Sequence, residues 1–243
     1  MDFFVVCTDL HTGDPIYHKC RSGDAEDVRW MEASASMPLA AKAVRIGHYS
    51  LLDGGVADSI PVRFFESLGY KRNLIILTQP KGFVKKKNPM LPAIRARYLR
   101  YPAFVAAVAD RHERYNETLS YIAMQEASGK DYVIRPPIPL EIGAMERDPA
   151  QLRRVYETGR AVAENQIDKI AAFLNDVRRR RNNPLSLASR QLPQRGASGV
   201  SAEAHAGRAK FLYIETAVPC YRGQQLHEQC SLSTLLLIYC SRA

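Results

Sequence analysis

The residues best placed to do chemistry lie in the first quarter of the chain. Asp53 is followed by Gly54 and Gly55, which allow the backbone to turn sharply directly after the carboxylate. Two serines, Ser34 and Ser36, precede it in a stretch of small residues. A carboxylate held on such a turn can serve as a general base, although Asp-Gly is also common in plain turns. The segment therefore indicates either a catalytic aspartate or an ordinary turn.

Strand and helix signals alternate around this segment. Asp2–Thr8 and Asn73–Thr78 are apolar runs that predict buried strands. Ala43–Leu52 predicts extended structure, interrupted by Gly47, that ends at the Asp53 turn. Further strands are expected over residues 15–20 and 131–135, and helices over 24–34, 59–68, 103–128 and 148–174. This alternation predicts an α/β domain with a largely parallel sheet.

The wider pattern around the turn resembles a known family. Residues 33–38 (ASASMP), then Tyr49 and Asp53-Gly54-Gly55, resemble the second half of the patatin-like phospholipase signature. Residues 69–82, which are followed by three lysines, and residues 133–136 resemble a bacterial subgroup with a C-terminal helical extension. The resemblance covers roughly residues 1–176. It implies a patatin-like three-layer sandwich with a mainly parallel sheet, truncated at its N-terminal side.

The resemblance also implies a chemistry. In this family a serine in a Gly-x-Ser-x-Gly elbow attacks a lipid ester, and the aspartate of the Asp-Gly-Gly motif accepts the serine proton without a histidine. Asp53 is the residue that carries over, with Gly54 and Gly55 as its motif. The reaction needs neither a cofactor nor a metal. The substrate would be a lipid ester.

The chain departs from the family in one respect that bears on activity. It contains no Gly-x-Ser-x-Gly motif and no glycine-rich oxyanion loop. Ser34 and Ser36 lack the flanking glycines that a nucleophile elbow needs. Loss of the nucleophile costs on the order of 10⁶-fold in turnover. We therefore expect a lipid acyl hydrolase fold that is inactive as given, and the alternative is a non-catalytic protein that binds a lipid or a partner.

Charge and composition divide the chain into three parts. We predict a partial α/β domain over 1–135, a helical extension over 136–176 and a basic tail of low order over 177–243. The tail holds nine Arg and one Lys against three Glu, which is +7 of the net charge of +9. The body is thus nearly neutral, which argues against a nucleic-acid partner. A disordered segment, non-native sequence after a frame shift, or a tail evolved for a partner would each explain the tail.

A basic segment follows the predicted strand at 73–78. Lys85–Lys87, together with Arg95, Arg97 and Arg100, forms either a solvated face or a contact with an anionic membrane surface. Tyr98 and Tyr101 among these arginines would suit either base stacking or helix packing.

The remaining signals concern the compartment and one histidine. Five cysteines without a Cys-x-x-Cys pair predict free thiols in a reducing compartment. No apolar run reaches the roughly 20 residues that a membrane span needs, so we expect a cytoplasmic protein. His48, five residues before Asp53, is a further candidate for the wall of a cleft.

Overall fold

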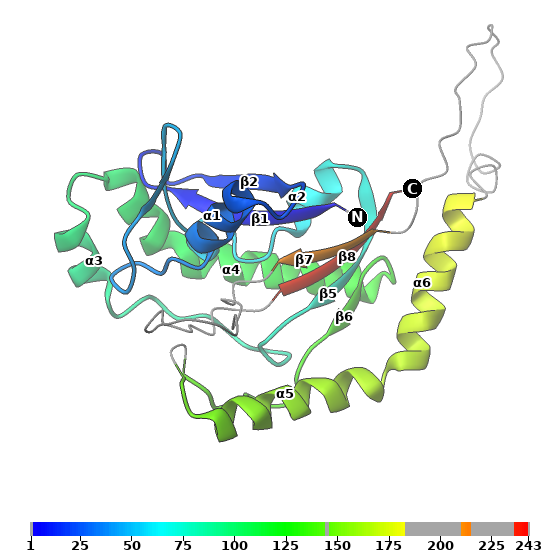
Figure 1. The fold of residues 1–243 in the computed structure, drawn as a ribbon. Coiled ribbons are helices and arrows are strands. Elements are labelled where there is room, and N and C mark those ends of the chain that lie inside the picture. The colour runs from blue at the N-terminus through cyan, green and yellow to red at the C-terminus, as the bar shows by residue number, and fades with distance from the viewer. Residues whose placement is uncertain (1, 144–145, 183–209, 215–235, 243) are drawn as a thin grey trace, which may run out of the picture.

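The computed structural model describes residues 2–143, 146–182, 210–214 and 236–242, and shows a mixed α/β fold. Strands and helices alternate along most of the chain (Figure 1). The strands are β1 (Phe3–Asp9), β2 (Pro15–Cys20), β3 (Val44–Ile46), β4 (Tyr49–Asp53), β5 (Tyr70–Ile76), β6 (Tyr132–Ile134), β7 (Lys210–Ile214) and β8 (Leu236–Arg242). The helices are α1 (Ala25–Ser34), the short 3₁₀ turn η1 (Gly54–Val56), α2 (Val62–Ser67), α3 (Leu91–Arg97), α4 (Pro102–Ala127), α5 (Pro149–Glu164) and α6 (Ile167–Asn182).

The first sheet has the strand order β2-β1-β4-β3 and is antiparallel at every junction. Two short connections explain this arrangement, because tight loops can join only antiparallel neighbours. The β1–β2 loop turns at Gly13 (φ 73°), and the β3–β4 loop turns at Gly47 (φ 57°). The extended structure expected over 43–52 is confirmed as strands β3 and β4, and the strand expected over 15–20 is confirmed as β2. In the register of β1 against β4, Cys7 lies opposite Asp53.

The second sheet has the strand order β6-β5-β8-β7. Its β5–β6 pair is the parallel junction, and β5–β8 and β7–β8 are antiparallel. The prediction of a largely parallel sheet is therefore wrong for the described residues. The apolar run of β5 correctly indicated a strand with neighbours on both sides, but such a run does not encode their direction. Strands β7 and β8 lie within the predicted low-order tail, while residues 183–209 and 215–235 of that tail lie outside the described residues.

Helix α1 packs on the first sheet and begins where the sequence predicted. The Asp24 carboxylate accepts the backbone N–H groups of Glu26 and Asp27, which is the usual N-cap arrangement. Trp30 and Ala33 of α1 are buried against Val5 and Leu51 of the sheet. The helix thus covers the face of β1 and β4 that leads to Asp53.

Helix α4 is the longest helix of the described residues, and in Figure 1 it passes below the first sheet and behind strands of the second. Phe104 and Val108 near its N-terminus pack against Leu52 and Val56, the residues that flank the Asp53 turn. Tyr115 and Ile122 join a second cluster with α2 and β5. The helix ends as predicted before Gly129, whose φ of 71° suits glycine best. One helix therefore contacts both the Asp53 turn and the second sheet.

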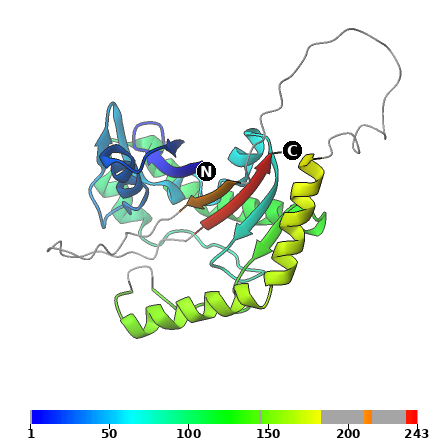
Figure 2. The same ribbon diagram turned by 45° about the vertical axis from the view of Figure 1, so that its right-hand side comes forward.

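Helices α5 and α6 wrap around the edge of the second sheet that carries β6 (Figure 2). Ile170 of α6 packs against Leu74 of β5 and Ile134 of β6. The single helix expected from 148 onward is two helices, because the chain bends at Asn165 and Gln166. Helix α6 continues past the expected change of character at residue 177, as far as Asn182.

Two checks concern the compartment prediction. Within the described part of the chain, no helix is both long and apolar enough to cross a bilayer. Cys7 and Cys20 are free, as expected, and both are buried, while Cys220 and Cys230 lie outside the described residues.

Candidate active site around Asp53

Asp53 lies at the end of β4, where the chain leaves the first sheet. The residue is only 5% exposed. Its backbone N–H donates to the Ser36 carbonyl at 2.8 Å, and its own carbonyl accepts the Thr8 hydroxyl at 2.8 Å. Thr8 Oγ1 also accepts the Ala57 N–H at 3.1 Å, so it joins the two ends of the turn. The backbone that carries the carboxylate is thus fixed by β1, by the segment after α1 and by its own turn.

The two glycines have different tasks in the turn. Gly55 donates its N–H to Asp53 Oδ1 at 2.7 Å, which closes a short side-chain turn. Gly54 lies so close to β1 that a Cβ atom there would overlap the Val6 carbonyl group. Glycine is needed at position 54 for close packing, since its φ does not lie in the left-handed region.

Two cations lie near the Asp53 carboxylate. Burial raises its pKa, and the charge of Arg111, the Gly55 N–H and the charge of Lys85 oppose that rise, in this order. Lys85 stands over the Tyr115 ring, with Nζ 4.8 Å from the centroid. Burial and the neighbouring Arg111 lower the pKa of Lys85 to about 8, although Asp53 opposes this. The three charges therefore form one coupled, largely buried group.

The carboxylate has one oxygen fixed and one available. Oδ1 accepts the Gly55 N–H, and no donor among the described residues is hydrogen-bonded to Oδ2. A general base needs such a free oxygen within hydrogen-bond reach of the proton it removes. The arrangement can hold a carboxylate base in a defined orientation.

A cleft of about 540 Å³ opens beside the turn. It lies between β2, the segment that follows η1, and α4. Its walls include Tyr17, Arg63, Arg111, Arg114 and Tyr115. Asp53 does not line this cleft, but Arg111 contacts both the cleft and the Asp53 turn. The cleft is thus adjacent to the candidate base and separated from it by the glycine turn.

The two serines named from the sequence are buried beside the turn and are not paired with Asp53. Ser36 Oγ donates to the Glu32 carbonyl at 2.8 Å. Ser34 Oγ is buried without a hydrogen-bond partner among the described residues. Neither hydroxyl is hydrogen-bonded to Asp53. Among the described residues, no serine hydroxyl is therefore hydrogen-bonded to the Asp53 carboxylate.

The remaining residues singled out from the sequence, one histidine and two tyrosines, lie away from the Asp53 carboxylate. His48 is exposed, contacts the Tyr49 ring in a tilted arrangement and does not line the cleft. Tyr98 is 5% exposed and packs against Phe104, so helix packing, and not base stacking, explains it. Tyr101 is half-buried with its ring edge-on to His11.

The basic segment at 81–100 divides into a buried and an exposed part. Lys85 is half-buried in the Asp53 group, which the sequence analysis did not anticipate. Lys86 and Lys87 are exposed, as are Arg95, Arg97 and Arg100.

Arg111 was not predicted as a site residue, although the sequence contains a signal for it. Ala107 and Tyr115 are buried on one face of α4, and Arg111 lies between them at four-residue steps. A charged residue on the apolar face of an amphipathic helix must find a polar partner.

A second polar cluster joins β2 to α1. One ligand atom each of His18, Cys20 and Asp27 lie within 4.8 Å of one another, so the trio could hold a metal ion. However, Asp27 Oδ1 already pairs with His18 Nε2 at 2.9 Å. Asp27 Oδ2 accepts the three backbone N–H groups of residues 21–23. Both oxygens of Asp27 are thus already hydrogen-bonded, and burial and the nearby carboxylates of Asp27 and Asp24 raise the pKa of Cys20 to about 12, which disfavours the thiolate that a metal would need.

Comparison with known proteins gives one partial match. Residues 101–175 match the model of DUF6363, a domain of unknown function. The match begins just before α4, includes β6 and α5, and ends within α6. No curated protein matches the chain.

Proposed function

We propose that Asp53 is the proton acceptor of a patatin-like lipid acyl hydrolase that cleaves carboxylic esters by a Ser–Asp dyad. The observation that supports this most directly is the carboxylate itself, which is buried, held at Oδ1 by the Gly55 N–H and left without a donor at Oδ2 among the described residues. An ordinary surface turn would leave such a side chain in water. The finer assignment to a patatin-like three-layer sandwich is part of the same proposal.

The proposed reaction assigns one step to this chain. Asp53 Oδ2 accepts the proton of a serine hydroxyl as the serine oxygen bonds to the ester carbonyl carbon, and the proton then passes to the departing alcohol. Water, deprotonated by the same carboxylate, releases the acyl group and restores the serine. The 243 residues contain no Gly-x-Ser-x-Gly motif, so they would supply the general base of the dyad but not its serine nucleophile.

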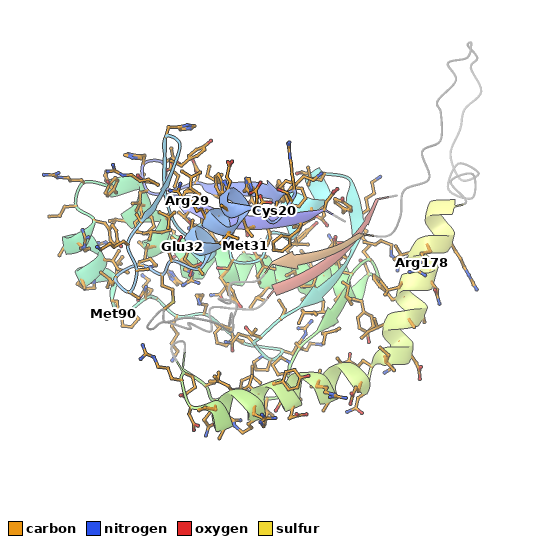
Figure 3. The ribbon with its side chains drawn as sticks, in the orientation of Figure 1. Cys20, Arg29, Met31, Glu32, Met90 and Arg178 are labelled. Atoms are coloured by element: carbon orange, nitrogen blue, oxygen red, sulfur yellow. The ribbon has the colours of Figure 1, made fainter. Side chains whose placement is uncertain are left out.

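A membrane-facing role for the segment at 81–100 supports a lipid substrate. Val84, Met90 and Leu99 are 67%, 53% and 77% exposed, so this segment offers large apolar side chains to a membrane. Met90 lies at the margin of the molecule beside α3 (Figure 3). Six exposed cations belong to the same segment, namely Lys81, Lys86, Lys87, Arg95, Arg97 and Arg100. We propose that this segment contacts an anionic membrane surface, where each cation adds about 1 kcal/mol.

The same segment would also suit the second candidate function, a non-catalytic lipid-binding protein. The observation that favours it is the absence of the elbow motif from the sequence. The two functions share the membrane contact and differ in whether Asp53 ever meets a nucleophile.

The deciding experiment begins with the gene. The locus is resequenced upstream of the Met1 codon and across the codons for residues 176–181, and any longer in-frame product is expressed beside the 243-residue chain. We expect a longer product with a Gly-x-Ser-x-Gly motif to hydrolyse a short-chain nitrophenyl ester, and the 243-residue chain to be inactive. Asp53→Asn should lower turnover of the longer product by about 10⁴-fold.

The matched control is Asp131→Asn, because Asp131 is 4% exposed and accepts hydrogen bonds from Asn73 on β5, away from the Asp53 turn. Equal losses in the two variants would mean that Asp53 is merely structural. An upstream stop codon with an unambiguous reading frame would favour the non-catalytic function. Ester hydrolysis by the 243-residue chain that is abolished by Asp53→Asn would contradict the expected inactivity.

A further inference from the structure

Helix α4 holds the Asp53 turn through two arginines. Arg111 Nε donates to the Gly55 carbonyl, and Arg114 Nη2 donates to the Val56 carbonyl at 3.1 Å. Both carbonyls belong to η1, the turn that follows Asp53 directly. The helix lies within residues 101–175, the segment that matches the domain of unknown function. This segment therefore contacts the candidate base through its turn.

The Arg111 guanidinium and the Asp53 carboxylate flank the same small space. A Cβ atom on Gly55 would lie 3.1 Å from Asp53 Oδ1 and 3.2 Å from Arg111 Nη2. Among the described residues, no carboxylate lies within the 4.0 Å of an ion pair with Arg111. A half-buried cation without a close counter-ion acts strongly on the nearest negative charge, because little water screens it.

The groups around the Asp53 carboxylate come from four parts of the chain. The Gly55 N–H belongs to η1, Arg111 to α4, Lys85 to the loop after β5, and Cys7 to β1. Burial and the charge of Asp53 raise the pKa of Cys7, so that side chain stays an uncharged thiol. Arg111 is the first of the groups that oppose the effect of burial on the pKa of Asp53.

We propose that Arg111 is a positioning residue, which holds the turn that carries Asp53 and favours the charged form of its carboxylate, so that residues 101–175 form part of the site. The proposal rests on the proposed function only for the catalytic role of Asp53. Arg111 acts through the turn and through its charge, and it does not itself touch the ester.

A purely structural role is the alternative, and Arg114 provides the matched control. Arg114 bonds to the same turn, but its charge acts on the carboxylate of Asp58. Arg111→Gln and Arg114→Gln each remove one arginine bond to η1. Only Arg111→Gln removes a cation that faces Asp53.

The experiment follows the titration of Asp53 in the full chain by carboxyl carbon NMR, with the signal assigned through Asp53→Asn. We expect Arg111→Gln to move the midpoint upward, because burial would then be opposed only by the Gly55 N–H and Lys85. Arg114→Gln should leave the midpoint unchanged. Equal shifts in both variants, or no shift in Arg111→Gln, would overturn the proposal.

If Arg111→Gln does not fold, Arg111→Met takes its place with the same two outcomes, since an unbranched apolar side chain keeps most of the packing on α4. The titration measures no hydrolysis. Arg111 can therefore prove to lower the pKa of Asp53 even if no esterase activity is found, and activity can be found even if Arg111 proves irrelevant.

Discussion

The packing of Gly54 against β1 leads to a quantitative prediction for stability. In Gly54→Ala the new methyl group would overlap the Val6 carbonyl group and also meet the Val6 side chain. Overpacking of this kind typically lowers the free energy of unfolding by about 1–3 kcal/mol. The overlapping atoms belong to β1, which is paired with β2 on one side and β4 on the other. Since β1 cannot move without breaking the hydrogen bonds to these two strands, we expect a loss of stability at the upper end of this range, about 3 kcal/mol.

The assay is thermal unfolding followed by circular dichroism. For a chain of this size, 1 kcal/mol corresponds to about 2–4 °C in unfolding temperature, so Gly54→Ala should unfold about 6–12 °C lower. Gly159→Ala is the matched control, because Gly159 lies in α5 with no atom within 4 Å of the added Cβ. That change should raise stability by up to about 1 kcal/mol through helix propensity. An unfolding temperature of Gly54→Ala within about 1 °C of the unmodified chain would refute the packing argument.

Two further predictions concern the α1 junction and the membrane surface. The pKa of Asp27 lies below its ordinary value, because the His18 hydrogen bond and three backbone N–H groups outweigh burial. Its contribution to stability is thus complete above about pH 4 and is lost as the pH falls through the folded-state pKa. Asp27→Asn should lower the free energy of unfolding in urea by about 2 kcal/mol at pH 7 and by less at pH 3. Equal losses at the two pH values would contradict this prediction. Leu99→Glu should weaken cosedimentation with anionic vesicles by about tenfold or more, whereas Val28→Glu on α1 should not, and equal effects would exclude a specific membrane face.

The elements around the site were predictable where local chemistry determines them. The Asp24 cap fixes the start of α1, and glycines at the two hairpin turns fix the ends of their strands. Strand direction was not predictable in the second sheet, because β5 is apolar whichever way its neighbours run. Helix α3 was missed because its N-cap, Met90, offers no side-chain hydrogen bond.

The site itself was only partly predictable. Asp53 and its glycines are local in sequence, and their turn follows from residue types alone. Arg111 is 58 residues away from Asp53, and Lys85 is 32 residues away, so their meeting depends on how α4 packs against the sheets. The sequence contains only the hint that an arginine occupies the apolar face of a helix. A hint of this kind says that a polar partner exists, but not which one.

The position of Arg111 also bears on how residues 101–175 should be understood. If this segment were an independent module, its contacts with the Asp53 turn would be few and polar. Instead Phe104 and Val108 share one apolar cluster with Leu52 and Val56, on either side of Asp53. Burial of this kind contributes on the order of 2 kcal/mol for each large side chain, so α4 and the turn stabilise each other. The N-terminal part of the matched segment is thus built into the wall of the candidate site, and any role found for Asp53 has to be explained together with α4.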